Sequence, residues 1–359
     1  MPLDSYVTLG RSGLRVSPFT LGAMTFGEDH GWGSSPEEAA SMMSEYIGRG
    51  GNSIDTANIY TNGHSEVIIG DYLAGSPGLR DRLVIGTKFF GNLWPGDPNG
   101  GGAGRKGIVA QAEESLRRLR TDYIDIYWLH NWDRTAPIEE TMRALDDLVT
   151  AGKIRYVGLS DLPAWKTTEA QMIAEFRGWT PAIALQVEYS LLARTVEGEH
   201  IAMAQQLGLG VMPWSPLRNG FLSGKFSRRR SGPVDARRTT LVGEPTEAEH
   251  EVIDVLEDVA AEAGVTPAAA ALSWVHNRPG VSSTLVGARR LDQLRANLDA
   301  VDVHLSQAQT EILDKVSAPS LNFPAGYVQL SLDLGFAGTT VDGVHSQMTP
   351  MLAHSPARY

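Results

Sequence analysis

The feature that most constrains the fold of this chain is a repeated alternation of short β-rich segments with longer helical patterns. The segments predicted as strands are Thr20–Met24, Ser53–Thr56, Leu83–Thr87, Ile124–Leu129, Tyr156–Leu159, Ile183–Val187, Gly210–Pro213 and Ser283–Val286. The predicted helices cover about residues 36–49, 65–74, 107–120, 137–151, 163–175, 200–207, 247–263, 291–299 and 306–316. Repeated strand–helix units form parallel sheets, and eight of them in 359 residues favour a closed (β/α)8 TIM barrel.

The alternative, an open doubly wound sheet, lacks its usual nucleotide-binding motif. No Gly-x-Gly-x-x-Gly follows the first predicted strand, and the glycine cluster at 100–104 indicates a flexible loop. We therefore predict one domain over residues 1–359, which begins with a β-hairpin at 7–16. The tail, residues 318–359, has few charges and many apolar side chains, so we expect it to pack on the barrel.

The charge and composition of the chain limit its partners. A net charge of -11 argues against binding to nucleic acid or to an anionic membrane. The chain has no cysteine, which excludes disulfides, thiol catalysis and Cys-ligated zinc, and it shows no metal-ligand spacing such as His-Glu-x-x-His. Residues 1–6 lack the pattern of a signal peptide and no apolar run could span a membrane, so we expect a cytoplasmic protein.

Four chemically active side chains come from consecutive predicted strands, and barrel active sites lie at the carboxyl ends of the strands. They are Asp55, Tyr60, Lys88 and His130. We expect Asp55 to hold Lys88 as a cation, and Lys88 to lower the pKa of Tyr60 from its reference value. Tyr60 would then act as a general acid toward a carbonyl oxygen, with His130 hydrogen-bonded to that oxygen. Each residue alone is more often structural, but their order at successive strand ends favours a joint catalytic role.

Such a site has no reductant of its own, and later strand ends carry residues suited to a cofactor. Trp214 could stack on a flat ring, with a buried structural tryptophan as the equal alternative. Lys225 and Arg289 could neutralise phosphates, although each alone is more often a surface cation. Gly287 precedes a predicted helix whose N-terminus suits an anion.

Several long motifs in this order resemble the aldo-keto reductase superfamily, and especially its aryl-alcohol-dehydrogenase-like branch. The resemblance runs from Leu9 to Asn297. It is carried by the sequences at 54–60, 86–88, 122–130, 152–160, 186–190, 214–217 and 285–297.

The resemblance implies a (β/α)8 barrel that binds NADPH without a Rossmann domain, with Asp55, Tyr60, Lys88 and His130 as the catalytic tetrad. It places Trp214 on the nicotinamide and Arg289 at the 2′-phosphate, which favours NADP over NAD. The other implied cofactor residues are Met24, Asp55, Ser160, Asp161, Gln186, Ser215, Pro216, Leu217, Lys225, Gly287, Gln293 and Asn297. Asp161 departs from the family, in which asparagine is common at this position; an ionised Asp161 can only accept hydrogen bonds.

The function we predict is reduction of a small-molecule aldehyde or ketone by NADPH. Three tryptophans in predicted loops, Trp32, Trp94 and Trp132, are candidate substrate walls, although packing within the loops explains them equally well. Two alternatives remain: a redox-sensing regulatory subunit of an ion channel, and a reductase of nucleotide-linked keto-deoxysugars. In the second, the basic run at 228–230 would meet a substrate diphosphate.

Overall fold

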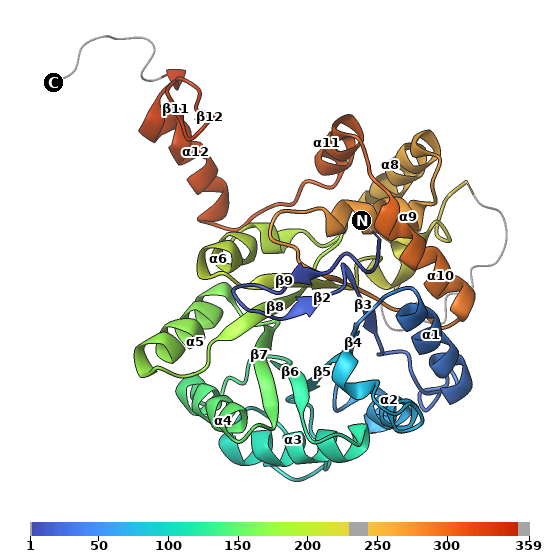
Figure 1. The fold of residues 1–359 in the computed structure, drawn as a ribbon. Helices are drawn as coiled ribbons and strands as arrows, with labels where there is room; N and C mark the ends of the chain where they lie inside the picture. The colour runs from blue at the N-terminus through green and yellow to red at the C-terminus, as the bar shows by residue number, and fades with distance from the viewer. Residues whose placement is uncertain (1, 230–242, 351–359) are drawn as a thin grey trace.

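The computed structural model describes residues 2–229 and 243–350, in which eight parallel strands form a barrel inside a ring of helices (Figure 1). The strands are β3 (Phe19–Gly22), β4 (Ser53–Asp55), β5 (Val84–Phe89), β6 (Ile124–Leu129), β7 (Ile154–Ser160), β8 (Ala182–Glu188), β9 (Gly210–Trp214) and β10 (Thr284–Val286). β10 pairs with β3. Between β9 and β10 the barrel is closed through the backbone of Val211. Its N–H donates to Gly280 O at 3.1 Å, and its carbonyl oxygen accepts from the Ser282 N–H at 2.9 Å. The predicted (β/α)8 barrel is confirmed.

The helices follow the strands in the predicted alternation. They are α1 (Pro36–Gly48), α2 (His64–Ala74), α3 (Arg105–Leu119), α4 (Ile138–Thr150), α5 (Ala164–Arg177), α6 (His200–Leu207), α8 (Glu247–Ala263), α9 (Pro267–His276), α10 (Leu291–Asp299), α11 (Gln307–Val316) and α12 (Ala325–Phe336). Most begin and end within two residues of the predicted bounds. No helix among the described residues is both long and apolar enough to cross a bilayer.

Helix α9 is the main element that was not predicted from the sequence. Seven of its ten residues are buried, so it lacks the polar face that makes a helix visible as a periodic pattern. The overlooked signal was local: the Thr266 hydroxyl accepts a hydrogen bond from the Ala269 N–H, and Pro267 occupies the first turn.

Inside the barrel, alternate residues of each strand point toward the axis. The indole of Trp128 on β6 is fully buried there and crosses to the neighbouring strand β7. A Cβ atom added at Gly158 would lie only 2.1 Å from the Trp128 ring. Glycine on β7 therefore makes room for the large ring that fills the barrel below the carboxyl ends of its strands.

The N-terminal hairpin closes the opposite end of the barrel. Its strands β1 (Val7–Thr8) and β2 (Arg15–Val16) are antiparallel, as predicted. Leu9 and Val16 are fully buried in the same cluster as Trp128 and Met212. Ligands must therefore enter the barrel from the other end.

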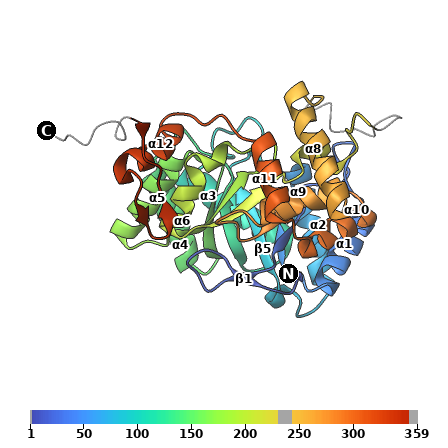
Figure 2. The same ribbon diagram turned by 90° about the horizontal axis from the view of Figure 1, so that it is seen from above.

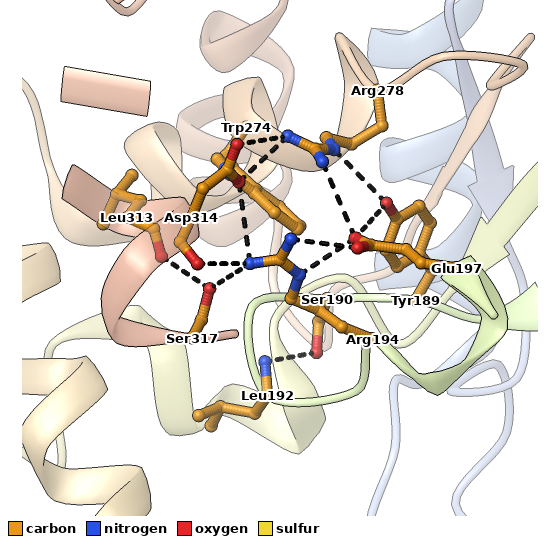
Figure 3. Close-up of polar contacts among 10 residues, drawn as sticks. All are labelled: Tyr189, Ser190, Leu192, Arg194, Glu197, Trp274, Arg278, Leu313, Asp314 and Ser317. Atoms are coloured by element: carbon orange, nitrogen blue, oxygen red, sulfur yellow. Dashed lines mark hydrogen bonds and ion pairs between the residues drawn. The ribbon is translucent and has the colours of Figure 1, made fainter. Parts of the chain in front are cut away.

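A buried polar cluster joins the loop after β8 to α9, the turn that follows it, and α11 (Figure 3). The Arg194 guanidinium, whose residue is 7% exposed, donates to both carboxylate oxygens of Glu197 at 2.9 Å. It also donates to Asp314 O at 2.9 Å and to Ser317 Oγ at 2.8 Å. Trp274 Nε1 donates to Asp314 Oδ1 at 2.9 Å. This cluster fixes the last barrel helices against a loop at the carboxyl end of the strands.

The packing of the tail, residues 318–359, on the barrel stays a prediction. Its helix α12 and the hairpin of β11 (Thr340–Val341) and β12 (Val344–His345) extend beyond α6 (Figure 1) and lie at the end of the molecule opposite α8 (Figure 2). Large apolar side chains remain exposed, with Phe323 at 86% and Val344 at 68%. The start of the tail lies close to the loop after β8, because a Cβ atom added at Gly198 would lie 3.3 Å from Ala325 Cβ and 3.5 Å from Leu321 Cδ2.

Candidate active site

The four predicted catalytic residues meet at the carboxyl ends of β4, β5 and β6. Asp55 ends β4 and Lys88 lies on the adjacent strand β5, both facing into the barrel. His130 follows β6, where its backbone N–H donates to Phe89 O at 3.0 Å. Tyr60 begins a short 3-10 helix (Tyr60–Gly63) after β4, which brings its ring over the strand ends.

Lys88 is the centre of this group. Its fully buried ammonium donates to Asp55 Oδ2 in an ion pair, and to Thr56 O at 2.8 Å. The same nitrogen lies 3.2 Å from the Tyr60 hydroxyl oxygen and 4.8 Å from the centre of the Tyr60 ring. Lys88 therefore connects the buried carboxylate to the phenol that faces the cleft.

Burial and charge act in opposite directions on each member of the Asp55–Lys88 pair. Burial raises the pKa of Asp55, against the pull of the Lys88 charge. Burial alone would lower the pKa of Lys88, but the Asp55 and Tyr60 charges outweigh it and raise that pKa above its usual value. Lys88 is therefore a cation throughout the physiological pH range.

The expectation for the pKa of Tyr60 was only half right. Burial raises the pKa of Tyr60 above 10.0, and the Asp55 charge adds to this, whereas the Lys88 charge lowers it. Lys88 has the expected sign, but desolvation of the phenolate is larger. At neutral pH Tyr60 thus carries its proton, as a general acid must.

His130 is neutral at this position. Its ring lies edge-on to Tyr60, with ring centroids 5.8 Å apart. Burial, and secondarily the Lys88 charge, lowers the pKa of His130 to about 3. A neutral imidazole carries one N–H, which can donate a hydrogen bond to an oxygen above Tyr60.

A cavity of about 520 Å³ opens beside the tetrad, and all fourteen predicted cofactor residues line it. They are Met24, Asp55, Ser160, Asp161, Gln186, Trp214, Ser215, Pro216, Leu217, Lys225, Gly287, Arg289, Gln293 and Asn297. Tyr60 and His130 lie in the same lining, so one cleft contains both the candidate proton donor and the candidate cofactor residues.

The unusual Asp161 bonds to the residue predicted to stack on the cofactor. Asp161 Oδ1 accepts from Trp214 Nε1 at 3.0 Å, and Asp161 Oδ2 accepts from Ser160 Oγ at 3.4 Å. Its backbone has φ of 57°, a conformation that aspartate and asparagine tolerate better than most residues. Burial raises the pKa of Asp161 to about 6, so the carboxylate is mostly ionised at neutral pH and remains an acceptor.

Residues at the start of α10 hold the shape of the cleft. Gln293 Oε1 accepts from the Arg289 N–H at 3.2 Å, and Asn297 Nδ2 donates to Gly287 O at 3.3 Å. The Leu291 N–H donates to Glu38 Oε1 at 2.6 Å. One N–H at the N-terminus of α10 is therefore already bound to a carboxylate. Fewer N–H groups are left there to bind an anion than the sequence indicated.

None of the three tryptophans predicted as substrate walls lines this cleft, so that role stays a prediction. Trp94 is 45% exposed in the loop after β5, and Trp32 lies near His30. Trp132 packs edge-to-face against Trp165, with centroids 5.5 Å apart. Trp165 was not among the predicted substrate residues, although it stands four residues after Asp161 at the same end of the barrel.

The sequence model of the Aldo/keto reductase family matches residues 18–318, a range that contains all eight barrel strands and the four candidate residues Asp55, Tyr60, Lys88 and His130. The chain belongs to this family, and it is an oxidoreductase of the aldo/keto reductase type.

Individual relatives match this chain over most of their own length. The uncharacterized oxidoreductase YrpG of Bacillus subtilis is 35% identical over 332 residues, 90% of this chain and 99% of that protein. An aryl-alcohol dehydrogenase [NADP(+)] of Phanerodontia chrysosporium is 34% identical over 330 residues, 87% of this chain and 85% of the relative. A probable voltage-gated potassium channel subunit beta of Oryza sativa subsp. japonica is 36% identical over 323 residues, 87% of this chain and 95% of the relative.

Proposed function

We propose that this protein is a cytoplasmic, NADPH-dependent reductase of aldehydes or ketones, with Tyr60 as the proton donor. The observation that carries the proposal is the Lys88 ammonium, which contacts both Asp55 and the Tyr60 hydroxyl where these residues border the cleft. A protonated phenol beside a fixed cation can give its proton to a carbonyl oxygen that gains negative charge.

Each residue of the group has a separate task. Tyr60 transfers its hydroxyl proton to the substrate oxygen, and Lys88 stabilises the phenolate that remains. Asp55 keeps Lys88 charged and in place. The neutral imidazole of His130 donates a hydrogen bond to the same substrate oxygen and so orients it. These fixed charges and donors lower the barrier without reorganising during the reaction.

The lining of the cleft fits a phosphorylated nicotinamide dinucleotide. Trp214 offers a flat ring, and Ser160, Asp161 and Gln186 offer polar atoms suited to a carboxamide. Lys225 and Arg289 bring positive charge to the same cavity of a chain whose net charge is -11. When bound, the nicotinamide would supply the hydride that the carbonyl carbon receives. The preference for NADPH rests on Arg289 and on the NADP(+) in the name of the fungal relative.

We propose that the substrate is a small aromatic aldehyde. Trp165, in the first turn of α5, is 58% exposed and Trp132 packs against it, which places an aromatic pair after His130 and Asp161 at the carboxyl ends of the strands. Aromatic rings prefer such offset and edge-on partners. The fungal relative is named for aryl alcohols, the products of reducing such aldehydes.

The experiment that tests this function follows NADPH absorbance with a panel of aromatic aldehydes, sugar ketones and quinones. The proposal predicts turnover that is fastest with aromatic aldehydes and is lost in Tyr60→Phe. Turnover confined to sugar ketones would reject the substrate class, and no turnover with any carbonyl would reject the reductase.

The alternative function, a regulatory subunit of an ion channel, is supported by the relative named as a potassium channel subunit. It predicts tight NADPH binding without turnover on the same panel. The second alternative, a keto-deoxysugar reductase, gains no support. Arg228 and Arg229 pair with Glu247 and Asp258 of α8, and Arg230 lies outside the described residues.

A further inference from the structure

The carboxylate of Asp55 has one well-satisfied oxygen and one poorly satisfied oxygen. Oδ2 pairs with the Lys88 ammonium. Oδ1 accepts from Gln186 Nε2 at 3.3 Å, a long hydrogen bond. Asp55 is only 2% exposed, so water cannot easily complete its coordination. Oδ1 of this buried carboxylate can therefore accept a second, shorter hydrogen bond.

Trp128 supplies the nearest candidate donor. Its indole is fully buried on β6, inside the barrel, and its Nε1 has no partner in good hydrogen-bond geometry among the described residues. Both groups border the same space: a Cβ atom added at Gly86 would lie 2.9 Å from Trp128 Nε1 and 3.0 Å from Asp55 Oδ1. Gly86 therefore keeps the gap between the N–H group and the carboxylate open.

The charges agree with an interaction between these two groups. Burial raises the pKa of Asp55, and the Lys88 charge, the Gln186 amide and the Trp128 indole each pull that pKa down. An indole N–H lowers a carboxylate pKa only by interacting favourably with the ionised form.

We propose that Trp128 is a positioning residue whose indole N–H hydrogen-bonds to Asp55 Oδ1 and holds the carboxylate that fixes Lys88. This proposal rests on the proposed function, because its kinetic consequence is expressed through proton donation by Tyr60. Trp128 does not line the cleft, so it acts through Asp55 rather than on the reactants.

The sign of the effect follows from the charges. An N–H bonded to Asp55 withdraws part of the negative charge that faces Lys88 and Tyr60. Loss of that bond leaves a stronger negative field, which neutralises more of the Lys88 charge and raises the pKa of Tyr60. The basic limb of the pH–kcat profile, where Tyr60 loses its proton, then moves to higher pH.

Trp128→Phe tests the proposal, since it removes the N–H and keeps an aromatic ring. We expect kcat to fall about tenfold, as for loss of one hydrogen bond to a charged group. The basic limb should rise by roughly half a pH unit, while the Kd and KM for NADPH stay unchanged.

The matched control is Trp274→Phe in the cluster of Figure 3. Trp274 is 2% exposed, and its Nε1 donates to the carboxylate of Asp314 at 2.9 Å, away from the cleft. This variant should lose stability and leave kcat and the pH profile unchanged. An unchanged basic limb in Trp128→Phe, with or without a loss of stability, would overturn the proposal.

A second measurement does not depend on turnover. In protein labelled with 15N-tryptophan, the Trp128 indole proton is assigned by its absence in Trp128→Phe or, if that variant does not fold, by incorporating benzothienyl-alanine at 128. The proposal predicts a downfield resonance that moves upfield in Asp55→Asn, whereas the Trp274 resonance does not move. A Trp128 resonance that ignores Asp55→Asn would overturn the proposal even if the protein proved not to be a reductase.

Discussion

The Lys88 ammonium nitrogen lies 3.2 Å from the Tyr60 hydroxyl oxygen and is held there by the carboxylate of Asp55 on the adjacent strand. This contact joins a fully buried ion pair to a phenol at the surface of a cleft. It is the basis for the proposal that Tyr60 donates a proton to a carbonyl oxygen at neutral pH.

Replacing the cation should remove most of the activity. In Lys88→Met the phenolate of Tyr60 loses its stabilising charge, so we expect kcat to fall at least about 100-fold. The buried Asp55 is also left unpaired, which should lower the free energy of unfolding by roughly 3 kcal/mol at neutral pH. Steady-state kinetics and urea unfolding measure the two effects. Lys153→Met, which breaks an exposed pair with Glu113, should change neither.

Asp161 predicts a pH dependence of stability. Its pKa is raised from 3.8 to about 6, so between these values the folded state keeps a proton that the unfolded state has lost. The free energy of unfolding should therefore decrease as pH rises from about 4 to 6, and this contribution stays constant above that range.

Substitution of Asp161 by the neutral amide isolates this effect. Asp161→Asn should be more stable than the wild type by up to roughly 2 kcal/mol at pH 7 and equally stable near pH 4. Urea unfolding at both pH values measures the difference. A difference that does not depend on pH would show that Asp161 does not titrate in this range.

Disrupting the polar cluster of Figure 3 should lower the free energy of unfolding without lowering kcat. Arg194→Met would leave Glu197 without its two guanidinium hydrogen bonds in a mostly buried site. The free energy of unfolding should fall by about 3 kcal/mol, with kcat at 25 °C unchanged. Arg117→Met, which removes an exposed pair with Glu114, should cost less than about 1 kcal/mol. Equal losses in the two variants would contradict a structural role for the cluster.

Arg289 should determine the preference for NADPH over NADH. If its guanidinium meets a 2′-phosphate, Arg289→Ala should weaken NADPH binding about tenfold or more and NADH binding little. Fluorescence titration with both cofactors measures this. Arg290→Ala is the neighbouring control, since that side chain pairs with Asp292 at the surface. Equal losses for both cofactors in Arg289→Ala would remove the proposed phosphate contact.

The fold and the convergence of the four candidate catalytic residues could be predicted because both follow from strand periodicity. Asp55, Lys88 and His130 stand at successive strand ends, and strands of a parallel barrel bring such positions together. Sequence order alone thus placed them in one site. The eight strands were visible for the same reason.

Other features depended on packing that the sequence does not state. Helix α9 was missed because it is buried nearly all round, and helix α12 was missed because its apolar residues do not lie on one face. The pKa of Tyr60 depends on burial as well as on Lys88, and burial was not predicted. The position of the Trp128 ring could not be predicted either, because it depends on space left by Gly86 and Gly158 on the two neighbouring strands.

The central claim, that Tyr60 donates the proton, is tested most directly by Tyr60→Phe. The substitution removes only the hydroxyl and keeps the ring beside Lys88 and His130. We predict that kcat/KM for an aromatic aldehyde falls about 1,000-fold or more, while the Kd for NADPH changes less than about twofold. Turnover within tenfold of the wild type would contradict the account.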